Sequence, residues 1–142
     1  MYLLHGKNIT CGYDTVDILS GCTVGVKKGE IASIVGPNGA GKSTAMKSIF
    51  GLLKIKIGKV FLDNEDITDL LPQERVLKGM GYVPQTNNIF PTLSVQENLE
   101  MGAFIQNEEF SDILDFVYDL FPVLKEKRNQ QAGELSGGQR QQ

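Results

Sequence analysis

The strongest constraint on the fold is a glycine-rich stretch that joins two segments of different periodicity. Residues 36–44 read GPNGAGKST and match the pattern G-x-x-x-x-G-K-[ST], with Gly36, Gly41, Lys42 and Ser43 at the fixed positions. The preceding run IASIVG is apolar on both faces, as expected of a buried central strand. The following STAMKSIFGLL has apolar residues at helical spacing. The order strand, glycine-rich turn and helix predicts an α/β fold.

This turn has the chemistry of a phosphate-binding loop. Glycines let successive backbone amides curl around an anion, and the start of the helix adds its positive end. Lys42 supplies a point charge between β- and γ-phosphate, the Ser43 hydroxyl is a ligand for Mg²⁺, and Thr44 has a lesser role. We therefore predict ATP or GTP binding with Mg²⁺. The predicted binding residues are Gly36, Pro37, Asn38, Gly39, Ala40, Gly41, Lys42, Ser43 and Thr44.

The two halves of the chain differ in the spacing of their apolar residues. From Tyr2 to about Phe61, short apolar runs broken by Gly, Asp and Lys predict strands, with a turn at Asp63 and Asn64. The acidic residues near that turn lack the spacing of an EF-hand calcium loop. Beyond Gln85, apolar residues three and four apart predict helices in residues 94–105 and 108–128. Ser94 with Glu97 fits a capping box, Ser111 is a second predicted N-cap, and Pro122 predicts a break between helices.

Composition limits the function classes. The net charge is −3, so no broad attraction to nucleic acid or anionic lipid is expected, and nucleic acid is not an expected partner. Cys11 and Cys22 are too few for a disulfide framework or a zinc site and fit a reducing compartment. The start of the sequence has no signal-peptide pattern, and 18 consecutive apolar residues occur nowhere.

The last eight residues, LSGGQRQQ, allow two interpretations on their own. Gly, Ser and Gln are typical of a flexible chain end. Two glycines beside a serine also expose backbone amides, and the polar run after them can begin a helix, which together would hold an anion. The segment alone favours the flexible end.

The order of three motifs changes that preference. Three motifs occur in this order: a phosphate loop, then the segment GYVPQTNNIF, called the Gln loop after Gln85, and then LSGGQ at residues 135–139, called the signature. In the second of them a short apolar strand is predicted to end at Pro84 and Gln85. In this the sequence resembles the ATP-binding subunits of ABC transporters over essentially its whole length. The resemblance implies a P-loop NTPase with a RecA-like core, an ABC-type antiparallel β subdomain and an α-helical subdomain. Residues 1–84 correspond to the β-rich subdomain and core, and residues 85–142 to the Gln loop and helical subdomain up to the signature.

The resemblance also implies roles for further residues. Tyr13 takes the place of an aromatic residue that stacks on adenine, as its π-face allows. Gln85 takes the place of a glutamine that reaches Mg²⁺ or the attacking water, which makes Lys42 and Gln85 the expected catalytic residues in this chain. Ser136, Gly137, Gly138 and Gln139 fall on the signature, which in this family caps the γ-phosphate of ATP held by a second subunit in a head-to-tail dimer.

The resemblance implies partners and a location as well. Residues 90–104 look most like the subunits that drive uptake of branched-chain and other hydrophobic amino acids. Transmembrane permease subunits would then hold the protein at the inner, cytoplasmic face of the cell membrane. The sequence departs from the family at Ile55, Lys56 and Ile57, and has Asn64 where Gly is usual; Asn adopts the same positive φ.

Some family features do not occur in these 142 residues. The strand ending in Asp and Glu, with its general-base Glu, and the switch His are not found, and the only histidine, His5, lies in the first predicted strand. The sequence therefore looks like the amino-terminal part of a larger ATPase, and we expect the 142-residue chain alone to bind ATP weakly at best and not to hydrolyse it. A soluble ABC machine of DNA repair or translation and a non-catalytic nucleotide-binding fragment stay open as alternatives.

Overall fold

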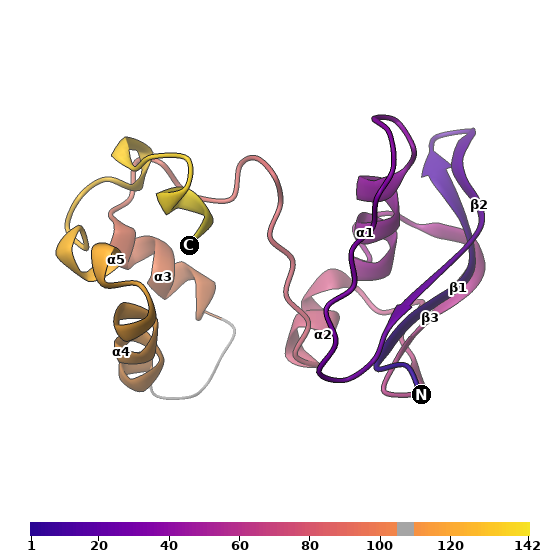
Figure 1. Ribbon diagram of the computed structural model, residues 1–142, viewed down its shortest axis with the longest axis horizontal. Coiled ribbons are helices and arrows are strands. Elements are labelled where there is room, and N and C mark those ends of the chain that lie inside the picture. The colour runs from indigo at the N-terminus through magenta and orange to yellow at the C-terminus, as the bar shows by residue number, and fades with distance from the viewer. Residues whose placement is uncertain (105–109) are drawn as a thin grey trace. The chain divides into compact units, whose positions relative to one another are not determined.

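The computed structural model describes residues 1–104 and 110–142. It contains two compact units, Met1–Gly81 and Tyr82–Gln142 (Figure 1). The first unit combines a β-sheet with two helices, whereas the elements of the second are helical.

The sheet of the first unit is antiparallel throughout. Its order is β2-β1-β3-β4, and the strands are β1 (Leu4–Tyr13), β2 (Val16–Val26), β3 (Ile55–Leu62) and β4 (Glu65–Asp66). The turn between β3 and β4 is made by Asp63 and Asn64, which have φ angles of 46° and 67°. The predicted strands at these places and the predicted turn are confirmed.

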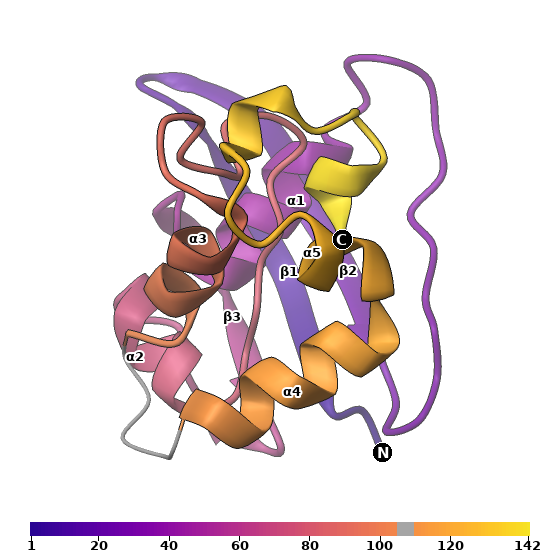
Figure 2. The same cartoon turned by 90° about the vertical axis from the view of Figure 1, so that its left-hand side faces the viewer.

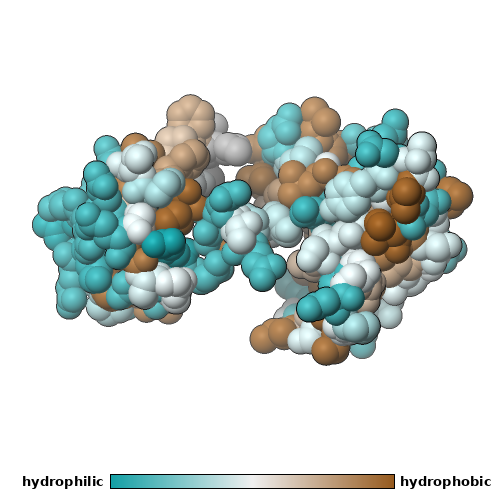
Figure 3. Space-filling model, turned by 90° about the horizontal axis from the view of Figure 1, so that it is seen from above, coloured by the Kyte–Doolittle hydropathy of each residue, from teal (hydrophilic) through white to brown (hydrophobic). Residues whose placement is uncertain are grey.

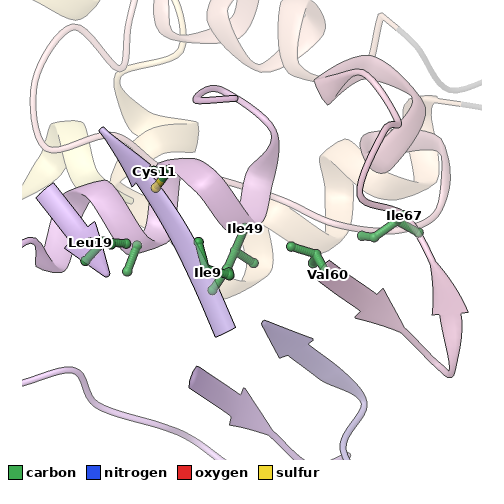
Figure 4. Packing of buried hydrophobic residues seen from close by; sticks show 7 residues of the cluster. Ile9, Cys11, Leu19, Ile49, Val60 and Ile67 are labelled. Carbon is green, nitrogen blue, oxygen red and sulfur yellow. The ribbon is translucent and has the colours of Figure 1, made fainter. Parts of the chain in front are cut away.

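Helix α1 (Lys42–Phe50) packs against β1 and β2 and closes the core of this unit. Figure 4 shows the packing, in which Ile49 of the helix meets side chains of the sheet. The buried cluster consists of Ile9, Cys11, Leu19, Ala45, Ile49, Val60 and Ile67. The helix predicted behind the glycine-rich turn is therefore confirmed.

The strand predicted for IASIVG is wrong. Residues 30–37 have no strand pairing, and Ile31 and Val35 are 98% and 91% exposed. The short apolar strand predicted to end at Pro84 and Gln85 is likewise wrong, because residues 81–85 are not in a strand. A central parallel strand exists only through hydrogen bonds to neighbours, and every strand of the described sheet belongs to the antiparallel ladder. Hydrophobic groups consequently lie at the surface (Figure 3).

The second unit is built from short helices around its own core. They are α3 (Val95–Gly102), α4 (Phe110–Leu120), α5 (Pro122–Glu126) and the 3₁₀ turns η1 (Ala132–Glu134) and η2 (Gln139–Gln141). Figure 2 shows α3, α4 and α5. Their shared buried residues are Val95, Tyr118, Leu124 and Leu135.

The caps and breaks of the helices in this unit agree with the sequence-based predictions, with one exception. Ser94 Oγ accepts from the Glu97 amide at 3.2 Å, and the Glu97 carboxylate accepts from the Ser94 amide at 2.7 Å, so the capping box is confirmed. The break at Pro122 between α4 and α5 is also confirmed. Ser111 is not an N-cap, because α4 already includes Phe110. Residue 105 and residues 108–109 of the predicted helical stretches lie outside the described residues.

The short strand β4 gives the first unit a measurable pH dependence. Asp66 accepts from the Lys59 ammonium at 2.7 Å and from the Thr68 hydroxyl at 2.6 Å and amide at 3.0 Å. These bonds, that of Lys59 first, lower the pKa of Asp66 to about 2 from 3.8. Because the pKa of Asp66 is lower in the folded than in the unfolded protein, its ionised carboxylate stabilises the fold at pH values above the unfolded pKa. This contribution is lost as the pH falls from about 4 towards 2.

We therefore expect Asp66→Asn to lower the free energy of unfolding by about 1 kcal/mol at pH 7, a discounted figure because the side chain is 36% exposed. The difference from the wild type should disappear near pH 2. Urea unfolding across that range measures it. Glu65→Gln, which removes only the exposed ion pair with Lys78, serves as the control and should change little. A difference that persists unchanged at pH 2 would contradict the assignment to the Asp66 carboxylate.

Candidate functional site

The glycine-rich stretch forms an exposed loop that ends at the start of α1. A turn closes with the Ala40 amide donating to Pro37 O at 3.2 Å, and Gly39 and Gly41 have φ angles of 84° and 85°. Both angles lie in the region that glycine adopts without strain. Gly41 is the N-cap of α1, and no side chain among the described residues caps the helix there. The positive end of α1 is thus open towards the loop, as an anion site requires.

Lys42 lies across this loop. Its ammonium donates to Gly36 O and to Pro37 O, each at 2.8 Å. The charge is therefore placed above the turn whose amides would hold a phosphate, and no carboxylate of the described chain forms an ion pair with it. Ser43 is exposed at the next position, whereas Thr44 is buried against the core. Of these two residues, Ser43 is therefore the one whose hydroxyl is accessible for the predicted contact with Mg²⁺, which prefers oxygen ligands.

Tyr13 stands at the end of β1, next to the hairpin turn that leads to β2. Gly12 makes this place possible, because a Cβ there would lie 1.8 Å from Val16 O. The Tyr13 side chain is 46% exposed, and the Lys47 ammonium of α1 lies 5.9 Å from the centre of its ring. Tyr13 and the predicted phosphate-binding residues therefore belong to one unit and are joined through α1.

Gln85 and the signature residues belong to the second unit. Gln85 is exposed in the irregular segment before α3. Three residues later, the Asn88 side-chain amide donates to Arg140 O at 2.9 Å, which ties this segment to the end of the signature.

The signature residues form an ordered turn. The Ser136 amide donates to Gln139 Oε1 at 3.2 Å, and the Gln139 amide donates to Ser136 Oγ at 3.4 Å, a reciprocal pair of the capping-box kind. Gly137 and Gly138 lie between them, exposed, before η2. Leu135 is 4% exposed in the core of this unit. The expectation of a flexible end, which the segment alone favoured, does not describe this turn.

Arg140 is a residue of the signature region that sequence reasoning missed. Its guanidinium donates to Leu135 O at 2.9 Å and to Gly133 O at 2.6 Å. Upstream, residues 128–132 pair with residues 93–96 through backbone bonds that include Val95 N to Gln130 O at 3.0 Å. The turn is thus held from both sides. A basic residue two positions after the Gly-Gly pair is the only sequence signal for this role.

Arg75 of α2 (Pro72–Leu77) is the second missed residue, and it supports α1 from behind. It is 1% exposed, and its guanidinium donates to Thr68 O at 2.8 Å, to Leu70 O at 3.0 Å and to Ile49 O in the last turn of α1. Burial lowers the pKa of Arg75, and Asp69 partly opposes this. The helix that carries the phosphate loop is therefore fixed at its far end by one buried cation.

Two kinds of feature are absent from residues 1–104 and 110–142. This part of the chain contains no cluster of three or more His, Cys, Asp or Glu side chains that could hold a metal ion. Its helices are all too short or too polar to cross a membrane.

A glycine-rich loop at the start of a helix and a capped LSGGQ turn are the two features expected of an ABC-type domain. The family model described as ABC transporter matches residues 19–142, and the chain belongs to this family. A probable branched-chain amino acid transport ATP-binding protein LivF of Archaeoglobus fulgidus is 44% identical over 98% of this chain and 59% of its own length. The lipopolysaccharide export system ATP-binding protein LptB of Haemophilus influenzae is 33% identical over 99% of this chain and 59% of its own length.

Solved structures support the same family and fold. A nucleotide-free ATP-binding cassette from an ABC transporter aligns with a TM-score of 0.83 at 34% identity, over 99% of this chain and 61% of that one. An ATP-binding cassette in its ADP conformation aligns at 0.77 and 33%, with the same coverage. A dimeric cassette bound to ADP and Pi aligns at 0.76 and 31%, over 96% and 65%. The P-loop NTPase fold class is confirmed, and the chain spans about three-fifths of the length of these relatives.

Proposed function

We propose that the loop of residues 36–44 binds the phosphates of ATP with Mg²⁺ and that the whole protein hydrolyses it. The observation that carries this proposal is the Lys42 ammonium above a loop that ends at the uncapped start of α1. The ADP conformation of a related cassette supports it. The γ-phosphate adds charge where the loop, Lys42 and the helix end all favour an anion.

The other site residues take roles that follow from their chemistry. The exposed Ser43 hydroxyl holds Mg²⁺, which spreads the charge that develops on the phosphates during transfer. Gln85 orients the attacking water or completes the metal shell. Tyr13 offers its half-exposed ring to the adenine base.

The signature acts on ATP held by another copy or a related subunit. The amides of Gly137 and Gly138 and the hydroxyl of Ser136 lie on one ordered turn, and such a set of donors suits the γ-phosphate. The dimeric related cassette bound to ADP and Pi supports a two-subunit arrangement. In this proposal each complete site takes its phosphate loop from one chain and its signature from the other.

Transport is the proposed output, with permease subunits as partners at the cytoplasmic face of the membrane. Branched-chain amino acid uptake is favoured because the LivF relative is 44% identical, against 33% for LptB. Exposed apolar side chains in residues 90–104, namely Phe90, Met101 and Phe104, suit a protein partner better than solvent. Lipopolysaccharide export is the second candidate, supported by LptB.

Competition among adenine nucleotides tests the nucleotide site. We expect the 142-residue chain to bind ATP and ADP with Mg²⁺ in equilibrium dialysis, and AMP at least about tenfold more weakly, because AMP has no β-phosphate for Lys42. AMP that competes as well as ATP would contradict binding through this loop.

Deletion of the gene in its native host tests the transported solute. Uptake of radiolabelled leucine should fall, and the complete gene carried on a plasmid should restore it. Unchanged leucine uptake would contradict the amino-acid assignment while leaving the nucleotide site untouched.

A further inference from the structure

The pair Tyr13 and Lys47 links the end of β1 to the helix that carries the phosphate loop. The Lys47 ammonium lies over the Tyr13 ring, 5.9 Å from its centre, within the range of a cation–π contact. Tyr13 is 46% exposed and follows Gly12 at the end of the hairpin, where it pairs with Val16. Lys47 is partly buried on α1, little more than one turn after Lys42.

A simpler role for Lys47 is to favour the negative end of α1, since it lies in the last turn of that helix. That role requires a positive charge but no particular direction of the side chain. The ammonium is nevertheless directed to the ring, and within the described chain it forms no ion pair with a carboxylate. The direction of the side chain therefore calls for a second role.

We propose that Lys47 is a positioning residue that holds the Tyr13 ring in place as the platform for the nucleotide base. This inference rests on the proposed nucleotide site. With one face of the ring under the ammonium, the base stacks on the other face. A cation on one face also draws electron density from the ring, which lessens repulsion between the two stacked π-systems.

This arrangement places the contacts to the phosphates and the platform for the base on the same helix. The phosphate contacts begin at Lys42 and the base platform is held from Lys47, so both are set by the same helix. Loss of the Lys47 contact should thus weaken recognition of the base and leave that of the phosphates intact. Inorganic tripolyphosphate, which has the phosphates of ATP and no base, separates the two.

The test is an NMR titration of the 142-residue chain with MgATP and with magnesium tripolyphosphate. For Lys47→Met we expect ATP binding to weaken about three- to fivefold, with tripolyphosphate binding unchanged. Lys47→Arg keeps a cation that stacks on aromatic rings and should retain wild-type affinity. The ring protons of Tyr13, assigned with Tyr13→Phe, should shift upfield with ATP only, and less so in Lys47→Met.

Two controls distinguish this proposal from a simple effect of the Lys47 charge on the end of α1. Lys54→Met removes the same charge at an exposed position just beyond α1 and should change neither affinity. In a Tyr13→Ala background, Lys47→Met should cause no further loss of ATP affinity. Equal weakening of both ligands by Lys47→Met, or a loss that persists without Tyr13, would overturn the inference and leave the phosphate site standing. If the wild-type chain binds neither ligand, the proposed nucleotide site fails as well.

Discussion

Replacing Lys42 with alanine is expected to weaken binding of both ATP and tripolyphosphate by about ten- to a hundredfold. A hydrogen bond to a charged group contributes about 1.5–3 kcal/mol, and the Lys42 ammonium is the cation placed over the loop. Titration calorimetry with Mg²⁺ present measures both affinities. The fold should survive, because the freed carbonyls of Gly36 and Pro37 are exposed and can accept hydrogen bonds from water.

Two variants make this result specific to the position of the charge. Lys28→Ala removes an equally positive side chain from the exposed segment after β2 and should leave both affinities unchanged. Lys42→Arg keeps the charge but replaces a compact ammonium by a longer planar group, so an intermediate loss is expected. If Lys42→Ala binds tripolyphosphate as well as the wild type does, the phosphates are held elsewhere.

Local signals in the sequence predicted the site better than long-range pairing. The loop at 36–44, the turn at Asp63 and Asn64 and the capping box at Ser94 each depend on residues within a few positions of one another. In each case the residue type itself favours the local conformation: glycine adopts a positive φ, Asn adopts the left-handed region, and Ser forms a capping box with a Glu three residues later. Such features were predicted and are present.

Apolar composition alone did not predict strand pairing. IASIVG has the residues of a buried strand, yet residues 30–37 are unpaired, because a strand depends on partners that its own sequence does not contain. The short strand predicted to end at Pro84 and Gln85 did not form for the same reason. The hydrophobicity of these segments favours burial, but strands form only where a neighbouring strand provides hydrogen-bonding partners.

Buried charge was the other feature that the sequence did not reveal. Arg75 occurs in PQERVL, where a charged residue directly after Gln73 and Glu74 suggests an exposed helix face. Its burial depends on backbone carbonyls from Ser48, Ile49, Thr68 and Leu70, which come together only in the folded unit. No spacing rule connects those positions.

Loss of the Arg75 side chain is accordingly expected to give the largest stability change in the first unit. Arg75→Met fills most of the space but supplies no donor, and the carbonyls of Thr68 and Ile49 lose their bonds to the guanidinium. Each unsatisfied buried polar group costs about 1–3 kcal/mol, so we expect the free energy of unfolding to fall by about 2–4 kcal/mol. Urea unfolding at pH 7 measures this.

The conservative variant shows whether the fork of donors or the charge matters. Arg75→Lys keeps a cation, but one ammonium cannot reach carbonyls that lie on several sides of a planar guanidinium, so it should recover less than half of the loss. The geometry also predicts a functional consequence. Because Arg75 holds the last turn of α1, the Arg75→Met variant should bind MgATP more weakly than the wild type at temperatures where both proteins are folded. Wild-type stability in Arg75→Met would mean that the carbonyls find other donors and that α1 is held by its apolar face alone.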